Sequence, residues 1–362
     1  MRIHNFAAGP AALPLPVLER AREELVDYRG TGTSVLEMSH RSPAYDEIHQ
    51  GAIAAVRRLM GVPEGWSVLL LHGGASLQFS MVPMNLMHPR RRADYVLTGS
   101  WAKKAAVEAR REGEVRIAAS TEADGFRRVP RGDELDVDPE ADYLHLTTNN
   151  TIFGTQMREL PQAGGVPLVA DMSSDVLSWP VPVERLGLLY AGAQKNLGPA
   201  GVTLVIVRDD LLERAPQGLA TMLQYRTHAA SDSLYNTPPT FAVYLMGLCL
   251  AWVEEQGGVA AMEAASRRKA DTLYAAIDGS GFYRGTAEPA SRSRMNVTFR
   301  LVDEALEKTF LAAAAEARPT RMVQLEGHRS VGGVRASLYN AVPQQAVDDL
   351  VAFLADFERR HG

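Results

Sequence analysis

The chain has 362 residues, a net charge of −5 and a pI near 6.0. This length is too great for one ordinary core, so we expect two domains, the larger one of α/β type. The weak acidity gives no reason to expect a nucleic acid or a membrane surface as partner. The basic run HPRRR at 88–92 lies in a connection, and we interpret it as a solvated loop.

Cys249 is the only cysteine, so an intrachain disulfide is excluded and a structural zinc site is not expected. It lies in the apolar run 241–252, where a buried core residue is a better interpretation than a nucleophile. That run is too short to cross a bilayer. Residues 1–14 lack the apolar segment of a signal peptide. These features predict a cytoplasmic enzyme or binding protein.

From Trp66 to about Arg208, short apolar runs alternate with amphipathic stretches. Strands are expected at 67–74, 94–100, 114–120, 142–150, 166–174, 186–193 and 201–210. Helices are expected at 75–87 and 101–113. Repeated strand–helix units with nearly continuous apolar strands predict a mostly parallel sheet that is covered by helices on both faces.

Beyond Arg208 the pattern changes to a polar loop and a long buried helix that ends at Gly257 and Gly258. Strands follow at 293–301, 321–327 and 332–340, with helices at 302–317 and 344–360. We expect a large α/β domain at 16–258. A smaller α+β domain would comprise 1–15 and 259–362, and the helix predicted at 15–28 would lie near the junction.

Polar or small residues follow five of the predicted strands. They are HGGAS (72–76), TGSW (98–101), TTNNT (147–151), ADMSS (170–174) and GAQKN (192–196). In parallel α/β sheets, ligands bind outside the carboxyl ends of the strands. We therefore expect these five segments to converge on one crevice.

Lys195 lies between two apolar runs, 186–193 and 201–210, in a tight turn made by the Gly and Pro residues of 198–201. A lysine held between buried strands is desolvated, which lowers the pKa of its amine and makes it a better nucleophile. Alternatively, its stem covers apolar surface while its head reaches water. This stretch alone leaves both interpretations open.

Asp171 and Lys195 at neighbouring strand ends suit pyridoxal phosphate. The amine can bond to the aldehyde, and the carboxylate keeps the ring nitrogen protonated. Trp101 could stack on the ring, and the N–H groups of Ala75 and Ser76, at a helix start, could hold the phosphate. Taken singly, these residues have simpler interpretations: Asp171 as a helix cap, Trp101 as a core residue and the Gly-Gly corner as a turn. Taken together, in this order, they favour a cofactor site.

Seven segments, found nearly from end to end of the chain, resemble the phosphoserine aminotransferases, fold-type I pyridoxal-phosphate enzymes of serine biosynthesis. They are NFAAGPAALP (5–14), GTSVLEMSHRS (32–42), HGGASLQF (72–79), YAGAQKNLGPAG (190–201), YNTPPTFA (235–242), SRMNVTF (293–299) and GHRSVGGVRASLYNA (327–341).

The resemblance implies that Lys195 carries the cofactor, that Asp171 pairs its ring nitrogen and that Trp101 stacks on its ring. It also implies that Gln194 and Thr151 bond the ring hydroxyl or the phosphate region. The phosphate would be held by Ala75, Ser76, Asn236 and Thr237. Some members have Gly-Arg in place of Ala75-Ser76, so this phosphate loop must rely on N–H groups and one hydroxyl.

The substrates implied by the resemblance are anions. L-Phosphoserine brings a phosphate and an α-carboxylate, and glutamate brings two carboxylates. The resemblance implies that Arg335 clamps the α-carboxylate bidentately. Two His-Arg pairs, His40-Arg41 and His328-Arg329, would then receive the phosphate or the glutamate side chain.

The sequence therefore predicts reversible amino transfer between O-phospho-L-serine and 2-oxoglutarate, in a homodimer whose subunits share their active sites. Asn236 and Thr237 would complete the cofactor site of the neighbouring subunit. Two alternatives are an alanine–glyoxylate type of aminotransferase and a non-catalytic protein that binds a phosphate ligand at HGGAS. Some family members also act on phosphohydroxythreonine in pyridoxine biosynthesis. The sequence does not decide whether this chain acts on that substrate as well as on phosphoserine.

Overall fold

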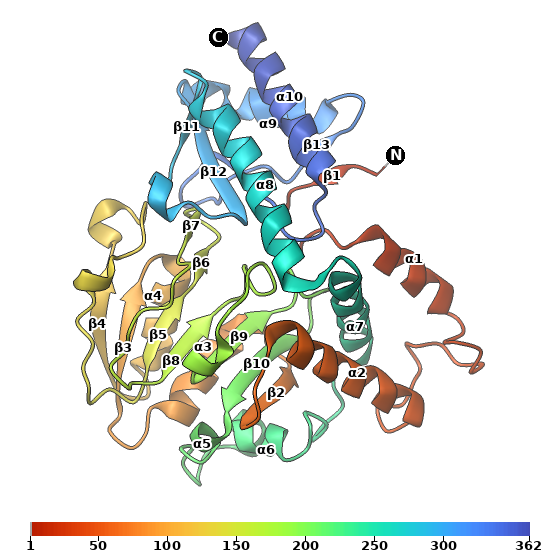
Figure 1. Cartoon of the computed structure of the whole chain (residues 1–362), viewed down its shortest axis with the longest axis vertical. Helices are drawn as coiled ribbons and strands as arrows, with labels where there is room; N and C mark the ends of the chain where they lie inside the picture. Colours follow the sequence, from red (N-terminus) through yellow and green to blue (C-terminus); the bar gives the residue numbers. More distant parts are fainter. Residues whose placement is uncertain (1) are drawn as a thin grey trace.

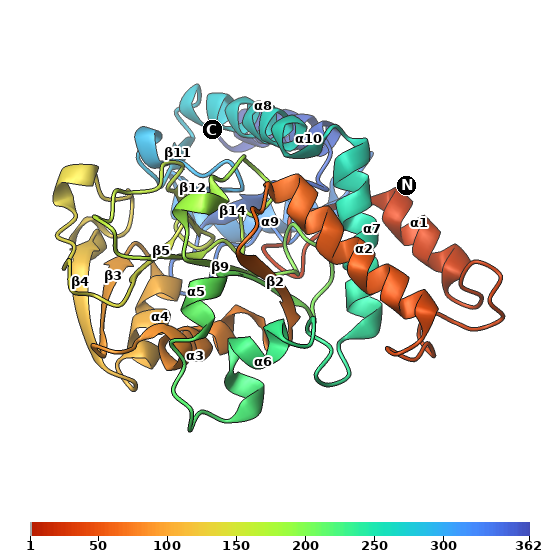
Figure 2. The same ribbon diagram turned by 60° about the horizontal axis from the view of Figure 1, so that its bottom comes forward.

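The computed structural model describes residues 2–362 (Figures 1 and 2). The strands of its main sheet are β2 (Trp66–Leu71), β3 (Arg92–Leu97), β4 (Glu114–Ser120), β5 (Leu144–Thr147), β8 (Leu168–Asp171), β9 (Leu188–Gly192) and β10 (Thr203–Arg208). Across the described residues these seven strands run in the order β2-β10-β9-β8-β5-β3-β4. Only β10 is antiparallel to its neighbours, so the expected mostly parallel sheet is confirmed.

Helices cover both faces of this sheet. On one face lie α2 (Pro43–Met60) and α7 (Thr240–Glu255), and on the other lie α3 (Gly74–Leu86), α4 (Ser100–Ala109) and α6 (Tyr225–Ala229). Because side chains alternate along a strand, Leu70 packs with the first group and Leu69 with the second. Both faces are therefore apolar, which accounts for the nearly continuous apolar runs in the sequence.

The C-terminal part has its own sheet and core (Figure 1). Strands β11 (Tyr283–Gly285), β12 (Asn296–Leu301) and β14 (Val334–Ser337) pair antiparallel. They pack with α8 (Gly258–Asp278), α9 (Glu307–Glu316) and α10 (Gln344–His361). The strand predicted at 321–327 is only β13 (Met322–Val323), and it pairs in parallel with β1 (His4–Asn5) instead of joining this sheet.

The remaining elements are short, apart from α1 (Leu15–Glu24), which ends four residues before the predicted helix. They comprise α5 (Asp209–Leu212), the hairpin strands β6 (Asn149–Asn150) and β7 (Thr155–Gln156), and single 3-10 turns. The turns are Glu122–Asp124, Gly132–Glu134, Val183–Arg185, Thr221–Leu223, Pro289–Ser291 and Glu304–Leu306. No helix within residues 2–362 combines the length and apolarity that a membrane crossing requires.

Two long helices, α2 and α8, were not predicted from the sequence. Local signals for α2 exist, because the Ser42 side chain accepts a hydrogen bond from the N–H of Tyr45 and Gly61 ends the helix in the left-handed conformation. Helix α8 joins the two cores: Met262 packs in the large one and Leu273 in the small one. We propose to retain the division at 258/259, with residues 1–15 in the smaller domain.

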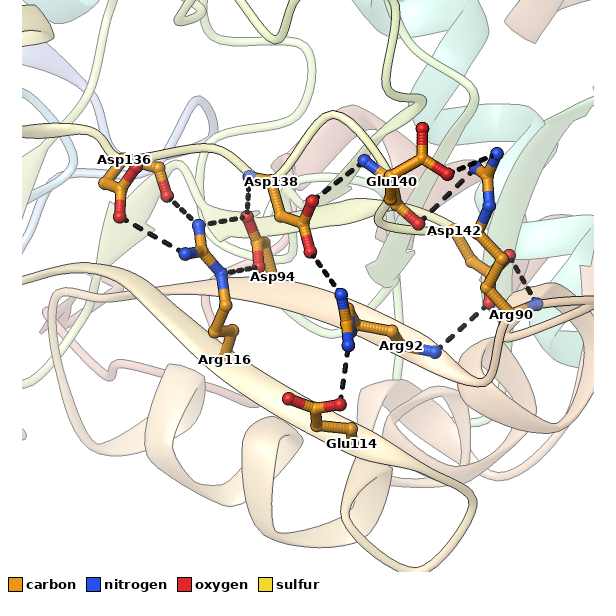
Figure 3. Close-up of polar contacts among 9 residues, drawn as sticks. All are labelled: Arg90, Arg92, Asp94, Glu114, Arg116, Asp136, Asp138, Glu140 and Asp142. Atoms are coloured by element: carbon orange, nitrogen blue, oxygen red, sulfur yellow. Dashed lines mark hydrogen bonds and ion pairs between the residues drawn. The ribbon is translucent and has the colours of Figure 1, made fainter.

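The interpretation of HPRRR as a solvated loop holds for residues 88–91, where Arg90 and Arg91 are exposed, but Arg92 begins β3, and Arg90 and Arg92 take part in an ion-pair network (Figure 3). Arg92 bonds Asp138 at 3.0 Å, and Arg90 pairs with Glu140. The guanidinium of Arg116 bonds both oxygens of the buried Asp94, at 3.0 and 3.2 Å. The network surrounds the amino ends of β3 and β4, away from the carboxyl ends where a ligand site is expected.

Candidate active site

A cavity of ≈ 320 Å³ lies at the carboxyl ends of the main-sheet strands. Its walls include residues from all five predicted strand ends: Ala75, Ser76, Trp101, Thr151, Asp171, Gln194 and Lys195. His328 and Arg335, from the C-terminal part, complete the wall. A cavity of ≈ 400 Å³ elsewhere, between Phe126 and Phe299, has no buried amine and carboxylate together in its walls. The smaller cavity is therefore the candidate active site.

Lys195 lies in the turn between β9 and β10, with its side chain on the cavity wall. Its Nζ donates a hydrogen bond to Thr151 Oγ1 at 2.8 Å. Burial lowers the pKa of the Lys195 amine to about 8, while the Asp171 charge raises it and the Arg335 charge lowers it. At a pH near this pKa, a large fraction of the Lys195 amine is therefore neutral. Of the two sequence interpretations, the structure supports the desolvated lysine.

The N-terminal segment closes over Lys195 at Gly9. The φ of this glycine is +137°, and a Cβ there would lie 3.3 Å from Lys195 Cγ. A side chain at this position would be strained and would crowd the lysine stem. The positive φ and the close approach to Lys195 explain why the AAGP segment has a glycine at position 9.

Asp171 is the last residue of β8 and is buried. One of its oxygens, Oδ1, accepts a hydrogen bond from the N–H of Ser173 at 2.9 Å. Burial raises the pKa of this carboxyl, and the Ser173 hydrogen bonds and the Lys195 charge act in the opposite direction. Because a carboxylate has more acceptor sites than this bond uses, Asp171 can receive a further donor from the cavity.

The amino end of α3 faces the same cavity through Gly74, Ala75 and Ser76. No side chain among residues 2–362 caps this helix end. Gly73, just before it, has φ +85°, and a Cβ there would meet Leu77 Cδ2 at 2.5 Å. The tight glycine corner thus leaves the first N–H groups of a 13-residue helix available to an anion.

Two residues of the cavity wall, Trp101 and Arg335, have a buried nitrogen that lacks a hydrogen-bond partner in the described chain. These atoms are Trp101 Nε1 and Arg335 Nε. Buried donors without partners are rare in folded proteins. Burial lowers the pKa of Arg335, and burial together with the charges of Arg335, Arg329 and Lys104 lowers the pKa of His328. Arg335 therefore places a positive charge on this side of the cavity, while the lowered pKa of His328 favours its neutral imidazole.

Several relatives and one family model match nearly the whole chain. The family model of class-V aminotransferases matches residues 3–350. A phosphoserine aminotransferase from Geobacillus kaustophilus is 57% identical over 99% of this chain and 99% of its own length. The solved phosphoserine aminotransferase of Bacillus circulans subsp. alkalophilus is 52% identical with a TM-score of 0.97, covering 100% of this chain and 99% of that one. The chain is a member of the phosphoserine aminotransferase family.

A further solved family member, from Trichomonas vaginalis, contains bound pyridoxal phosphate. It is 39% identical to this chain, with a TM-score of 0.92 and coverage of 98% of this chain and 100% of that one. The fold-type I architecture expected from the sequence is thus confirmed.

In the present chain, five of the residues that the sequence singled out do not line the cavity. They are His40, Arg41, Asn236, Thr237 and Arg329. His40 has a buried Nε2 without a partner within residues 2–362, and Thr237 is exposed. The chain therefore brings together one part of the predicted site and leaves the other part outside the cavity.

Sequence reasoning missed the contacts that join the C-terminal part to the neighbour of Lys195. The N–H of Asn340 donates to Asn196 Oδ1 at 2.9 Å, and Asn340 Nδ2 donates to the carbonyl of Leu177 at 2.9 Å. The Tyr339 hydroxyl donates to the carbonyl of Ala8 at 2.9 Å. Four of these residues lie within three of the segments that carry the family resemblance, and Leu177 lies outside them, but no local pattern identifies their partners.

Proposed function

We propose that this enzyme transfers an amino group reversibly between O-phospho-L-serine and 2-oxoglutarate, giving 3-phosphohydroxypyruvate and L-glutamate, with pyridoxal phosphate as cofactor. The observation that carries the proposal is one cavity whose wall contains the Lys195 amine, the Asp171 carboxylate, the His328 imidazole and the Arg335 guanidinium. The proposal includes a role in serine biosynthesis and the cytoplasmic location expected from the sequence. An alanine–glyoxylate type of enzyme would need a small neutral side-chain pocket in place of the two His-Arg pairs, His40-Arg41 and His328-Arg329.

The residues present fit the cofactor. A buried amine and a buried carboxylate suit its aldehyde and its ring nitrogen, and the uncapped amino end of α3 suits its phosphate. Ala75 and Ser76 would hold that phosphate through backbone N–H groups and the Ser76 hydroxyl. Trp101 would cover the ring, with Gln194 and Thr151 bonding its polar edge.

The chain's own groups would bind the reactants and move the proton. When bound, pyridoxal phosphate supplies an electron sink for the substrate carbon that loses its proton. Lys195 Nζ, with its pKa of about 8, would move the proton from that carbon to the former aldehyde carbon of the cofactor, and would move a proton in the opposite direction in the second half of the reaction. The Asp171 carboxylate would favour the protonated ring nitrogen.

Substrate binding would use the cationic side of the cavity. Arg335, whose Nε has no partner in the described chain, would bind the α-carboxylate in a bidentate pair. His328, Arg329, His40 and Arg41 would bind the phosphate or the glutamate side chain.

We propose a homodimer in which Asn236 and Thr237, and the His40-Arg41 pair, act in the neighbouring subunit's site. Apolar side chains exposed near these segments support this arrangement: Val26 is 81%, Leu36 55% and Tyr235 50% exposed. A twofold interface would complete two equivalent sites at once.

The test is to measure 2-oxoglutarate formed from L-glutamate and 3-phosphohydroxypyruvate by the wild type and by Lys195→Ala. We expect turnover in the wild type and none in the variant, which should keep its circular-dichroism spectrum and some cofactor. Borohydride should fix the cofactor on Lys195 of the wild type, which a non-catalytic phosphate-binding protein would not show. Wild-type-like turnover in Lys195→Ala would refute the mechanism.

Substrate choice is tested by comparing phosphoserine with serine. Charge-assisted hydrogen bonds contribute roughly 1.5–3 kcal/mol each, so Arg41 and Arg329 together give about 3–6 kcal/mol. This corresponds to a preference of ~10² to ~10⁴ in kcat/KM, before solvent exposure reduces it. Comparable rates with both substrates would show that these arginines do not recognise the phosphate.

A further inference from the structure

A lysine outside the cavity wall lies against one of its aromatic residues. Lys104 follows Trp101 by three positions on α4, so both side chains lie on the same side of the helix. The Lys104 Nζ lies 4.5 Å from the centroid of the Trp101 ring, within cation–π distance. Because Trp101 is part of the cavity wall, this contact holds an ammonium group near the active site.

The neighbouring lysine shows what is unusual about Lys104. Lys103 forms an ion pair with Glu122. Lys104 is also exposed, but within the described part of the chain no carboxylate lies within ion-pair distance of it. One lysine of this helix is neutralised, and the one beside the cavity is not.

The charge of Lys104 adds to that of the substrate-facing cations. It is one of the charges that lower the pKa of His328, together with Arg335 and Arg329. Like charges gathered without a counter-ion repel one another, and an anion placed among them is attracted by all of them. Lys104 therefore adds a positive charge beside Trp101, a residue of the cavity wall.

We propose that Lys104 is a further specificity-determining residue, whose ammonium, held over Trp101, attracts the phosphate dianion of the substrate into the cavity. The proposal rests on the proposed function, because it assigns the phosphorylated substrate to this site. The ligand class is a phosphomonoester dianion that also carries an α-amino acid. A doubly charged phosphate gains more from this ammonium than a carboxylate does, and an uncharged hydroxyl gains little.

The experiment compares Lys104→Met, which keeps the apolar stem, with Lys103→Met as the matched control and Lys104→Arg as the conservative variant. The holoenzyme is assayed with O-phospho-L-serine and with L-serine at low and high ionic strength. We expect Lys104→Met to lower kcat/KM for phosphoserine ~10-fold at low salt, mainly through KM, since charge steering contributes factors of this order or more. Lys103→Met should change it less than about twofold, since surface substitutions have small effects.

Two further readouts separate this role from support of the Trp101 ring. The loss should shrink at high ionic strength, where the Debye length falls to about 3 Å at 1 M. Serine turnover should not change, and Lys104→Arg should restore most of the phosphoserine rate. Proton NMR of the free enzyme should show a higher His328 pKa in Lys104→Met than in the wild type.

Equal losses for serine and phosphoserine, or equal effects of Lys103→Met and Lys104→Met, would overturn the role of Lys104. If the wild type turns over phosphoserine and Lys104→Met has the same kcat/KM, the role of Lys104 is also overturned, but the proposed function is not. A wild type without activity on phosphoserine would refute the proposed function itself.

Discussion

Lys269 is a buried lysine that the proposed chemistry does not use. It lies on α8, and its Nζ donates hydrogen bonds to the carbonyls of Leu338, Tyr339 and Val342 at 2.8, 2.7 and 3.0 Å. The segment that it holds begins directly after β14, the strand of Arg335, and includes Asn340. We predict that Lys269→Met, which keeps the stem but removes the donors, destabilises the enzyme.

The magnitude follows from the acceptors that lose their donor. The Tyr339 carbonyl also accepts the N–H of Val342, so it keeps one partner. The carbonyls of Leu338 and Val342 lose the donor that Lys269 supplies. An unsatisfied buried acceptor costs about 1–3 kcal/mol, so two of them give roughly 2–6 kcal/mol of lost unfolding free energy. This is a large share of the ~5–15 kcal/mol by which folded proteins are stable.

The effect should depend on pH. Burial, with a smaller contribution from Arg268, lowers the pKa of Lys269 to about 7, whereas an unfolded lysine titrates near 10.4. Between these values the unfolded chain binds more protons at this position than the folded one, so the lysine's contribution to stability rises with pH. The deficit of Lys269→Met should therefore be larger at pH 9 than at pH 7.

The assay is urea unfolding of wild type, Lys269→Met and the control Lys308→Met, followed by circular dichroism at both pH values. Lys308 is exposed on α9, so its substitution should change the unfolding free energy by no more than ~0.5 kcal/mol. The reasoning fails if Lys269→Met is as stable as the control, or if its deficit shrinks as the pH rises.

Three other predictions concern the site and the sheet edge. Asp171→Asn should lower turnover far more than cofactor affinity, because an amide does not favour the protonated ring nitrogen. An unchanged rate of α-proton exchange would show that another residue is the partner of the ring nitrogen. Mixing Lys195→Ala subunits with Asn236→Ala subunits should restore part of the activity, since each mixed dimer has one intact site; no recovery despite proven subunit exchange would refute the shared site. Asp94→Asn should cost ~1.5–3 kcal/mol in urea unfolding through its paired bonds with the partly exposed Arg116, and wild-type stability would contradict this.

Local pattern predicted much of the candidate site. Each of the five polar segments follows an apolar run directly, and parallel strands bring such segments to one edge of a sheet. The structure gathers residues of all five at one cavity, with Lys195 and Asp171 among them. Helix α2 was not predicted, although its Ser42 cap and its Gly61 stop are both local features of the sequence.

The sequence by itself determined the strand–helix alternation and the polar strand ends, because both depend on residues close together in the chain. Tertiary structure alone decided that β10 lies antiparallel between β2 and β9, and that β1 pairs with β13. It also decided the bonds of Lys269 to carbonyls about 70 residues away. Such contacts depend on which buried surfaces meet after distant segments have come together, and neither periodicity nor local turn chemistry contains that information.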